Sequence, residues 1–169
     1  MTVAVRRMRQ RSHVGLTQRA LGVAGAAALF VDGFVHFQDA HFYDSVAGSV
    51  VSQGMLFRAE AVVATLLGLG LLVWPRMITW IAALLVLASA FGAVMLYRYV
   101  NIGALGPLPN MYEPTWVSPG KLDSAWAEGA GVAISTLGLF VSRRAYRRNA
   151  ESIAQSRRHE ASRAAREAA

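Results

Sequence analysis

Two apolar runs separated by a two-residue break, MLFRAEAVVATLLGLGLLVWPRMITWIAALLVLASAFGAVMLY (residues 55–97), decide the fold of this 169-residue chain. A membrane-spanning helix needs about 20 mostly apolar residues, because each residue rises about 1.5 Å and the hydrocarbon core is about 30 Å thick. Residues 55–74 and 77–97 each meet that length. Proline cannot continue the helix before it, so Pro75 and Arg76 predict a tight turn between two antiparallel neighbouring helices.

Two further segments reach the same length, residues 17–37 (TQRALGVAGAAALFVDGFVHF) and residues 122–142. A hydrophobic content of 54% and a mean hydropathy of +0.36 are also too high for an ordinary soluble domain. We therefore expect an all-α fold, in which a bundle of four transmembrane helices occupies residues 17–142. Residues 1–16 form a basic N-terminal stretch, and residues 143–169 form a basic tail that is either a solvated helix or disordered.

The first apolar segment could instead be a secretory signal peptide, because a basic stretch precedes it and small residues follow it. Asp32 and His36 interrupt its apolar run, and a signal peptide has a shorter apolar core. We therefore interpret residues 17–37 as a spanning helix.

The distribution of arginine predicts the orientation of the bundle, since short cytoplasmic segments carry an excess of Lys and Arg. Residues 38–54 contain no Lys or Arg, and residues 99–121 contain only Lys121. With four spans, ten arginines that flank the helices fall on one side of the membrane: Arg6, Arg7, Arg9, Arg11, Arg19, Arg76, Arg143, Arg144, Arg147 and Arg148. We expect both termini in the cytoplasm and a multi-pass protein of a bacterial inner (plasma) membrane.

Composition also limits the partners and cofactors. The chain has no cysteine, which excludes disulfides, thiolate metal sites and iron–sulfur clusters. The net charge of +7 lies at the two ends, where it favours binding to anionic lipids of the bilayer. No nucleic-acid partner is expected, because aromatic residues are nearly absent among these arginines. A homo-oligomer or a larger membrane complex remains open.

Three carboxylates lie at one level of the predicted bundle. Asp32, Glu60 and Glu128 come from three different helices, each about 7 to 9 Å inside the outer end of its helix. Ionisable side chains inside membrane spans normally face the bundle interior and are functional candidates. Together with nearby basic groups they form the candidate ligand- or ion-binding set: Asp32, His36, Arg58, Glu60, Arg98 and Glu128.

Two interpretations of this set remain open. In the first, Arg58 and Arg98 pair with the carboxylates in a structural network, and the chain is a non-enzymatic subunit or interaction protein. In the second, the charges line an outward-facing cavity that binds or transports a small solute, an ion or a proton. Two sequence motifs of enzymes, a Gly-x-Ser-x-Gly elbow and a Gly-rich phosphate loop, are missing. No catalytic residue is therefore predicted, and an enzyme is not expected.

No cofactor is predicted. Carboxylate and imidazole ligands would permit a divalent metal ion, but no His-x-x-x-His or Glu-x-x-His pair fixes its geometry. Haem held by two histidines is not expected either, because of the four histidines only His36 lies inside a span.

The two outer loops carry further polar residues. Asp39, His41 and Asp44 follow the first helix, and we expect a solvated acidic loop there rather than a metal site. The loop before the fourth helix is rich in proline and contains Tyr112 and Trp116. It is either a lid above the charged set or a connector lying on the membrane, and we favour the connector.

The layout resembles the small four-helix integral membrane proteins of actinobacteria. The likeness rests on the four spans, the stretch HFQDAHFYD at the end of the first helix, the turn LLVWPR, and the loop YEPTW before an acid-bearing fourth helix. It implies the fold and the topology, and it transfers no catalytic or binding residues.

Overall fold

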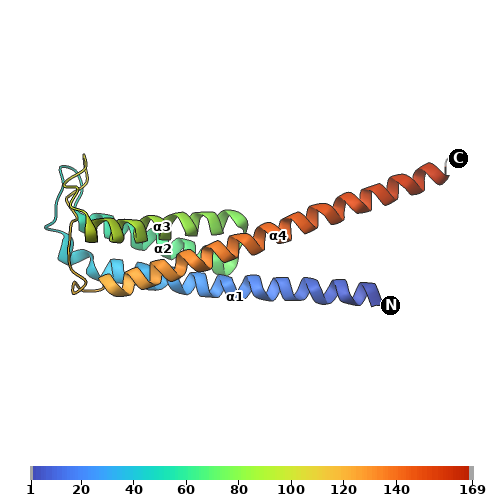
Figure 1. Cartoon of the computed structure of the whole chain (residues 1–169), viewed down its shortest axis with the longest axis horizontal. Helices are drawn as coiled ribbons and strands as arrows, with labels where there is room; N and C mark the ends of the chain where they lie inside the picture. Colours follow the sequence, from blue (N-terminus) through green and yellow to red (C-terminus); the bar gives the residue numbers. More distant parts are fainter. Residues whose placement is uncertain (1, 168–169) are drawn as a thin grey trace.

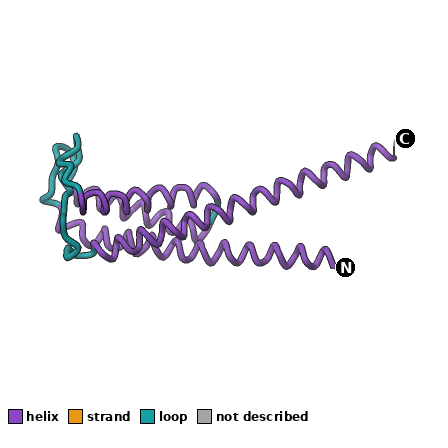
Figure 2. Tube along the Cα trace, in the orientation of Figure 1, coloured by secondary structure: helices purple, strands orange, loops and turns teal. Residues whose placement is uncertain are grey.

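The protein is a bundle of four α-helices. The structure, a computed structural model, describes residues 2–167 and the side chains of residues 15–166. The helices are α1 (Thr2–Asp39), α2 (Gln53–Val73), α3 (Met77–Tyr99) and α4 (Lys121–Glu167), and a short 3-10 helix, η1 (Ala40–Tyr43), follows α1 (Figures 1 and 2). Residues 2–167 contain no strand. The predicted all-α fold is confirmed, and all four helices are long and apolar enough to cross a membrane.

The first and last helices are longer than the predicted spans. The basic stretch before residue 17 is part of α1, and α4 continues without a break from Lys121 to Glu167. Residues 143–167 contain neither Gly nor Pro and are rich in Ala, Arg and Glu, which favour helix. The tail is therefore a helix, as in the first of the two alternatives left open by its composition, a solvated helix or a disordered tail.

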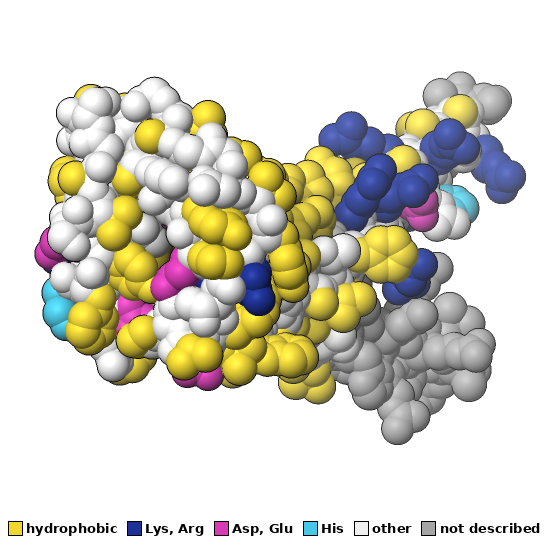
Figure 3. Space-filling view, turned by 60° about the vertical axis from the view of Figure 1, so that its left-hand side comes forward, with side chains coloured by type: hydrophobic (Ala, Val, Ile, Leu, Met, Phe, Trp, Pro, Cys, Tyr) yellow, Lys and Arg dark blue, Asp and Glu magenta, His cyan; other side chains and the backbone are white. Residues whose placement is uncertain are grey.

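The two chain termini lie at the same end of the bundle as the α2–α3 turn, and the two long connections lie at the opposite end (Figure 1). We call these the terminal end and the loop end. In the space-filling view, Lys and Arg side chains crowd the projecting part of the molecule, whereas hydrophobic side chains dominate the exposed bundle face (Figure 3). This distribution matches a bundle surrounded by lipid with charged ends outside it.

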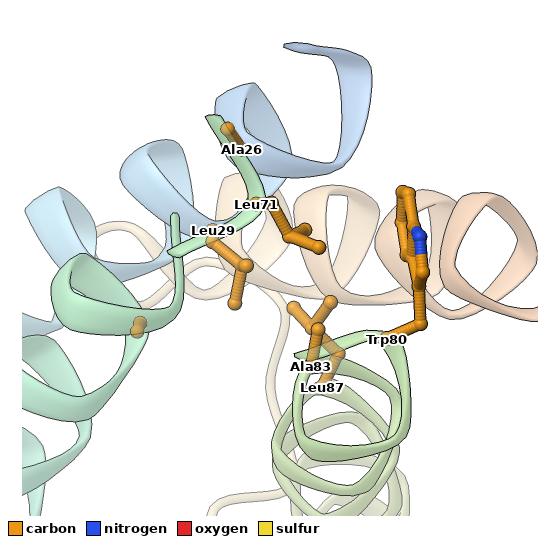
Figure 4. Close-up of a cluster of buried hydrophobic side chains, with 7 residues drawn as sticks. Ala26, Leu29, Leu71, Trp80, Ala83 and Leu87 are labelled. Atoms are coloured by element: carbon orange, nitrogen blue, oxygen red, sulfur yellow. The ribbon is translucent and has the colours of Figure 1, made fainter. Parts of the chain in front are cut away.

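The apolar core occupies the half of the bundle nearer the terminal end. α1 packs against α2 and α4, and α3 packs mainly against α4. The buried core residues come from three helices, with the Trp80 ring of α3 standing against α4 (Figure 4): Ala26, Leu29, Ala64, Leu71, Trp80, Ala83 and Leu87. Alanines at these contacts let the helix backbones approach closely.

One side chain joins three elements at the terminal end. The Gln18 amide Nε2 donates to the Pro75 carbonyl oxygen at 2.8 Å and to Ser142 Oγ at 3.0 Å. It therefore links α1 to the α2–α3 turn and to α4. Within the turn itself, the Arg76 guanidinium makes a cation–π contact with Trp74, at 4.0 Å from the centre of the ring.

At the loop end, residues 44–52 and 100–120 connect the helices and contact each other. Ser49 Oγ donates to the Gly106 carbonyl at 3.3 Å, and the Ser52 hydroxyl caps α2 by accepting from the Met55 amide at 3.1 Å. Gly120, with φ of +66°, ends the second connection directly before α4 and lies against Asp39. A side chain at residue 120 would collide with that carboxylate, so the glycine permits α4 to begin close to α1.

Candidate functional site

A cavity of about 310 Å³ lies at the loop end, between the helices and beneath the second connection. All four helices contribute to its wall: α3 supplies mostly small residues such as Ala90 and Ala93. The polar and ionisable side chains in the wall are His36, Asp39, Tyr43, Gln53, Glu60, Ser89, Tyr97, Glu113, Lys121 and Ser124. We call it the loop-end cavity.

Directly behind one wall of this cavity, α1 and α4 bring together a buried cluster. Asp32 and His36 are four residues apart on α1, and Ser124 and Glu128 are four apart on α4, so each pair shares one helix face. Asp32 and Glu128 are both 0% exposed, and His36 and Ser124 separate them from the cavity. We call Asp32, His36, Ser124 and Glu128 the buried cluster.

Hydrogen bonds link the two helices within the buried cluster. His36 Nδ1 lies 3.0 Å from Asp32 Oδ1 and 3.0 Å from the Asp32 carbonyl oxygen. The Ser124 hydroxyl donates to Glu128 Oε1 at 2.6 Å and also lies 3.3 Å from Asp32 Oδ1. The edge of the Phe57 ring meets the imidazole, with 4.8 Å between the ring centroids, and fixes its position from α2. The three helices therefore hold these groups in one arrangement.

Two oxygen atoms of the cluster are left over. Asp32 Oδ2 and Glu128 Oε2 are buried and have no hydrogen-bond partner among the described residues. A buried, unsatisfied acceptor is expensive, at about 1 to 3 kcal/mol, and more for a charged group. The cluster therefore has unused capacity to accept protons or bind a cation.

Neither candidate arginine neutralises these acids. Arg58 forms a two-pronged ion pair with Asp44, with Nη1–Oδ1 at 2.6 Å and Nη2–Oδ2 at 2.8 Å. Arg98 lies instead over the rings of Tyr99 and Trp116, at 5.1 and 5.5 Å from their centres. Among the side chains of residues 15–166, no Lys or Arg forms an ion pair with Asp32, Glu60 or Glu128. This differs from the arginine-paired network that the sequence allowed.

Arg58 and Glu60 are two residues apart on α2, and they have different surroundings. Arg58 is exposed, whereas Glu60 is partly buried in the wall of the loop-end cavity, which it shares with His36. Glu60 Oε1 is another buried oxygen without a described partner. Of the three acids expected at one depth, Asp32 and Glu128 thus lie in the buried cluster, and Glu60 lies in the wall of the loop-end cavity.

The first connection differs in part from the solvated acidic loop that we expected. His41 and Asp44 are exposed, and the Arg58 guanidinium beside it holds the pKa of Asp44 below its usual range. Asp39, however, is buried at the end of α1 and lines the loop-end cavity. The difference arises because α1 continues to Asp39 and carries it beneath Gly120.

The second connection covers the cavity and is held there by Glu113. Met111, Glu113 and Pro119 line the cavity from above. The Tyr43 hydroxyl donates to the two Glu113 carboxylate oxygens at 3.3 and 3.2 Å, Ser118 donates to the same carboxylate, and Lys121 Nζ lies 3.5 Å from Oε2. This placement is that of a cover over the charged residues, one of the two alternatives for this loop.

Sequence reasoning missed Ser124, which bridges the two buried acids. Its spacing of four from Glu128 was the available signal, because residues four apart share a helix face. No protein-family model matches this chain, and no curated protein or solved structure shows a significant match to it.

Proposed function

We propose that this chain is an integral membrane protein that binds a small cation or a small cationic solute in the loop-end cavity. The observation that carries the proposal is a set of acids that form no ion pair with a lysine or arginine among the described side chains. Asp32 and Glu128 are fully buried, Glu60 lines the cavity, and the two nearby arginines are engaged elsewhere. Carboxylates in such surroundings attract positive charge because little water screens them.

The orientation proposed for the protein follows from its arginines. Short cytoplasmic segments are enriched in Lys and Arg, and the basic residues cluster at the terminal end. The terminal end then faces the cytoplasm of a bacterial cell, and the loop-end cavity faces the outer side of its plasma membrane. A ligand would approach from outside the cell.

A second candidate function is that of a subunit or interaction protein, and the length of α4 favours it. Residues 143–167 of α4 continue past the α2–α3 turn, and their described side chains are mostly exposed (Figure 1). Such a basic helix suits an anionic lipid surface or an acidic partner. The two functions are compatible, since they use opposite ends of the molecule.

Replacing Glu60 tests cation binding in the loop-end cavity. The full chain in detergent micelles would be heated with a panel of probes: Na⁺, K⁺, Mg²⁺, Mn²⁺, methylammonium, guanidinium and choline. A bound ligand raises the free energy of unfolding by about 2.7 kcal/mol at 100 times its Kd, so at least one probe should raise Tm in a saturable manner. Glu60→Gln should weaken that response, because it removes a negative charge from the cavity wall.

Asp123→Asn is the matched control for Glu60→Gln. Asp123 is an exposed acid at the same end of the bundle and does not line the cavity. The Asp123→Asn substitution should leave the Tm response to the probe unchanged. The proposal fails when no probe shifts Tm, or when both substitutions weaken the response equally.

A further inference from the structure

The buried cluster has the dimensions of a metal site. One imidazole nitrogen of His36 and one carboxylate oxygen each of Asp32 and Glu128 all lie within 4.8 Å of one another. Two ligands of a tetrahedral Zn²⁺ ion, each at about 2.0 to 2.2 Å from it, lie about 3.4 Å apart. A side-chain adjustment of less than about 1 Å would therefore place all three around one ion.

The two unpartnered oxygens supply an independent indication of a ligand. Asp32 Oδ2 and Glu128 Oε2 belong to side chains that are completely buried, and neither accepts a hydrogen bond from a described residue. Ser124 satisfies only the other oxygen of Glu128, and His36 only the other oxygen of Asp32. Each carboxylate thus keeps one oxygen free for coordination while its second oxygen is held in place, as ligating carboxylates usually are.

We propose that Asp32, His36 and Glu128 bind a divalent first-row transition-metal ion such as Zn²⁺, Mn²⁺ or Co²⁺. This inference rests on the proposed cation-binding function and names the class of cation for the same end of the bundle. An ion of charge +2 would neutralise the two carboxylates, with the imidazole as a neutral third ligand, and a neutral site is the arrangement that burial favours. An imidazole nitrogen selects transition metals over Mg²⁺ and Ca²⁺, which prefer oxygen ligands.

The loop-end cavity provides the route to this site. His36 and Ser124 belong both to the buried cluster and to the cavity wall, and Glu60 lies in the same wall. An incoming cation would pass the side chains of this wall to reach the buried cluster. Three protein ligands leave at least one coordination position open for water or a further ligand.

Cobalt binding tests the proposal directly. The full-length chain, free of any histidine tag, would be purified in micelles, stripped with a chelator and titrated with Co²⁺ alone. We expect one Co²⁺ per chain, visible absorption bands of a protein-bound ion, and displacement by Zn²⁺. Loss of a group that merely supports a metal ligand weakens binding by about 10- to 100-fold, so Asp32→Asn, His36→Gln and Glu128→Gln should each weaken it by at least about tenfold.

His41→Gln is the matched control, because His41 is an exposed imidazole at the same end of the bundle. It should leave the Co²⁺ affinity unchanged, and equal weakening in this variant would assign the binding to surface histidines and overturn the proposal. Circular dichroism and gel filtration would show which variants fold. Even if a variant does not fold, the wild-type titration tests the proposed metal site. A folded wild-type chain that takes up no Co²⁺, Zn²⁺ or Mn²⁺ contradicts the site.

The outcomes also separate this inference from the proposed function. A chain that takes up none of the three metals, yet shows a Tm response to another cation that depends on Glu60, retains the proposed function and loses the metal site. In that case protons shared between Asp32 and Glu128 would compensate their charges. A chain that responds to no cation of either kind contradicts both.

Discussion

Asp32 and Asp44 are the same residue type in very different surroundings. Asp44 is exposed and paired with Arg58, whereas Asp32 is completely buried and has His36 and Ser124 as its neighbours. Exposed ion pairs contribute little, because water and salt screen them and because two side chains must be ordered. Buried carboxylates depend strongly on each neighbouring group, so substitutions at Asp32 should affect the protein far more than substitutions at Asp44.

The exposed pair makes a prediction about pH. Because the Arg58 hydrogen bonds lower the pKa of Asp44, the pair contributes stability above the pKa that Asp44 has in the unfolded chain. That contribution is lost as the pH falls through the lowered pKa of the folded state. Arg58→Gln should raise the pKa of Asp44 towards its ordinary value, as measured by ¹³C NMR of the carboxyl carbon.

Arg76→Gln serves as the control for this measurement. Arg76 lies over Trp74 in the α2–α3 turn, at the opposite end of the bundle, so its removal should leave the titration of Asp44 unchanged. An Asp44 pKa that stays low in Arg58→Gln would contradict the pairing.

At the scale of the helices, small residues decide how closely α3 and α4 approach. Ala88 and Gly92 are four residues apart on α3, a spacing at which small residues often let two helices touch, but a Cβ at Gly92 would meet nothing within 4 Å. Gly138 of α4 lies directly against the buried Trp80 ring. Small residues are frequent on every face of these helices, so spacing alone could not identify the face that packs.

Gly138→Ala should therefore destabilise the bundle. A Cβ at this position would lie 2.5 Å from atoms of the Trp80 ring, which is completely buried and has no space to retreat. Overpacking of this kind costs about 1 to 3 kcal/mol. Thermal unfolding in micelles should show a lower Tm for Gly138→Ala, with Gly92→Ala within about 1 kcal/mol of the wild type, because alanine favours helix and has room there. Equal Tm values for the two variants would contradict this packing.

At the scale of the whole molecule, the sequence was sufficient for the number and order of the helices and for the approximate bounds of α2 and α3. Long apolar runs must form helices in lipid, and Pro75 and Arg76 leave room only for a tight turn. The sequence also brought Asp32 and Glu128 to one level, since depth depends only on residue count. It could not identify Asp44 as the partner of Arg58 or predict the burial of Asp39, because these depend on helix rotation and on the paths of the two connections.

The arrangement of the ends makes a prediction about topology. Both termini lie at one end with the α2–α3 turn (Figure 1), and from the positive-inside bias we expect that end in the cytoplasm. A fluorescent protein fused after Trp74 should therefore be fluorescent in the cytoplasm, and alkaline phosphatase fused after Pro109 should be active outside it. Phosphatase activity from a fusion after Trp74 would contradict this orientation and would place the loop-end cavity on the cytoplasmic side.

The two hydrogen bonds of Gln18 fasten α1 to the α2–α3 turn and to α4, and the apolar core lies beside them. Gln18 lies at the end of the bundle opposite the loop-end cavity and does not line it. Substitution of Gln18 would therefore remove a link between three elements without touching any residue in the cavity wall.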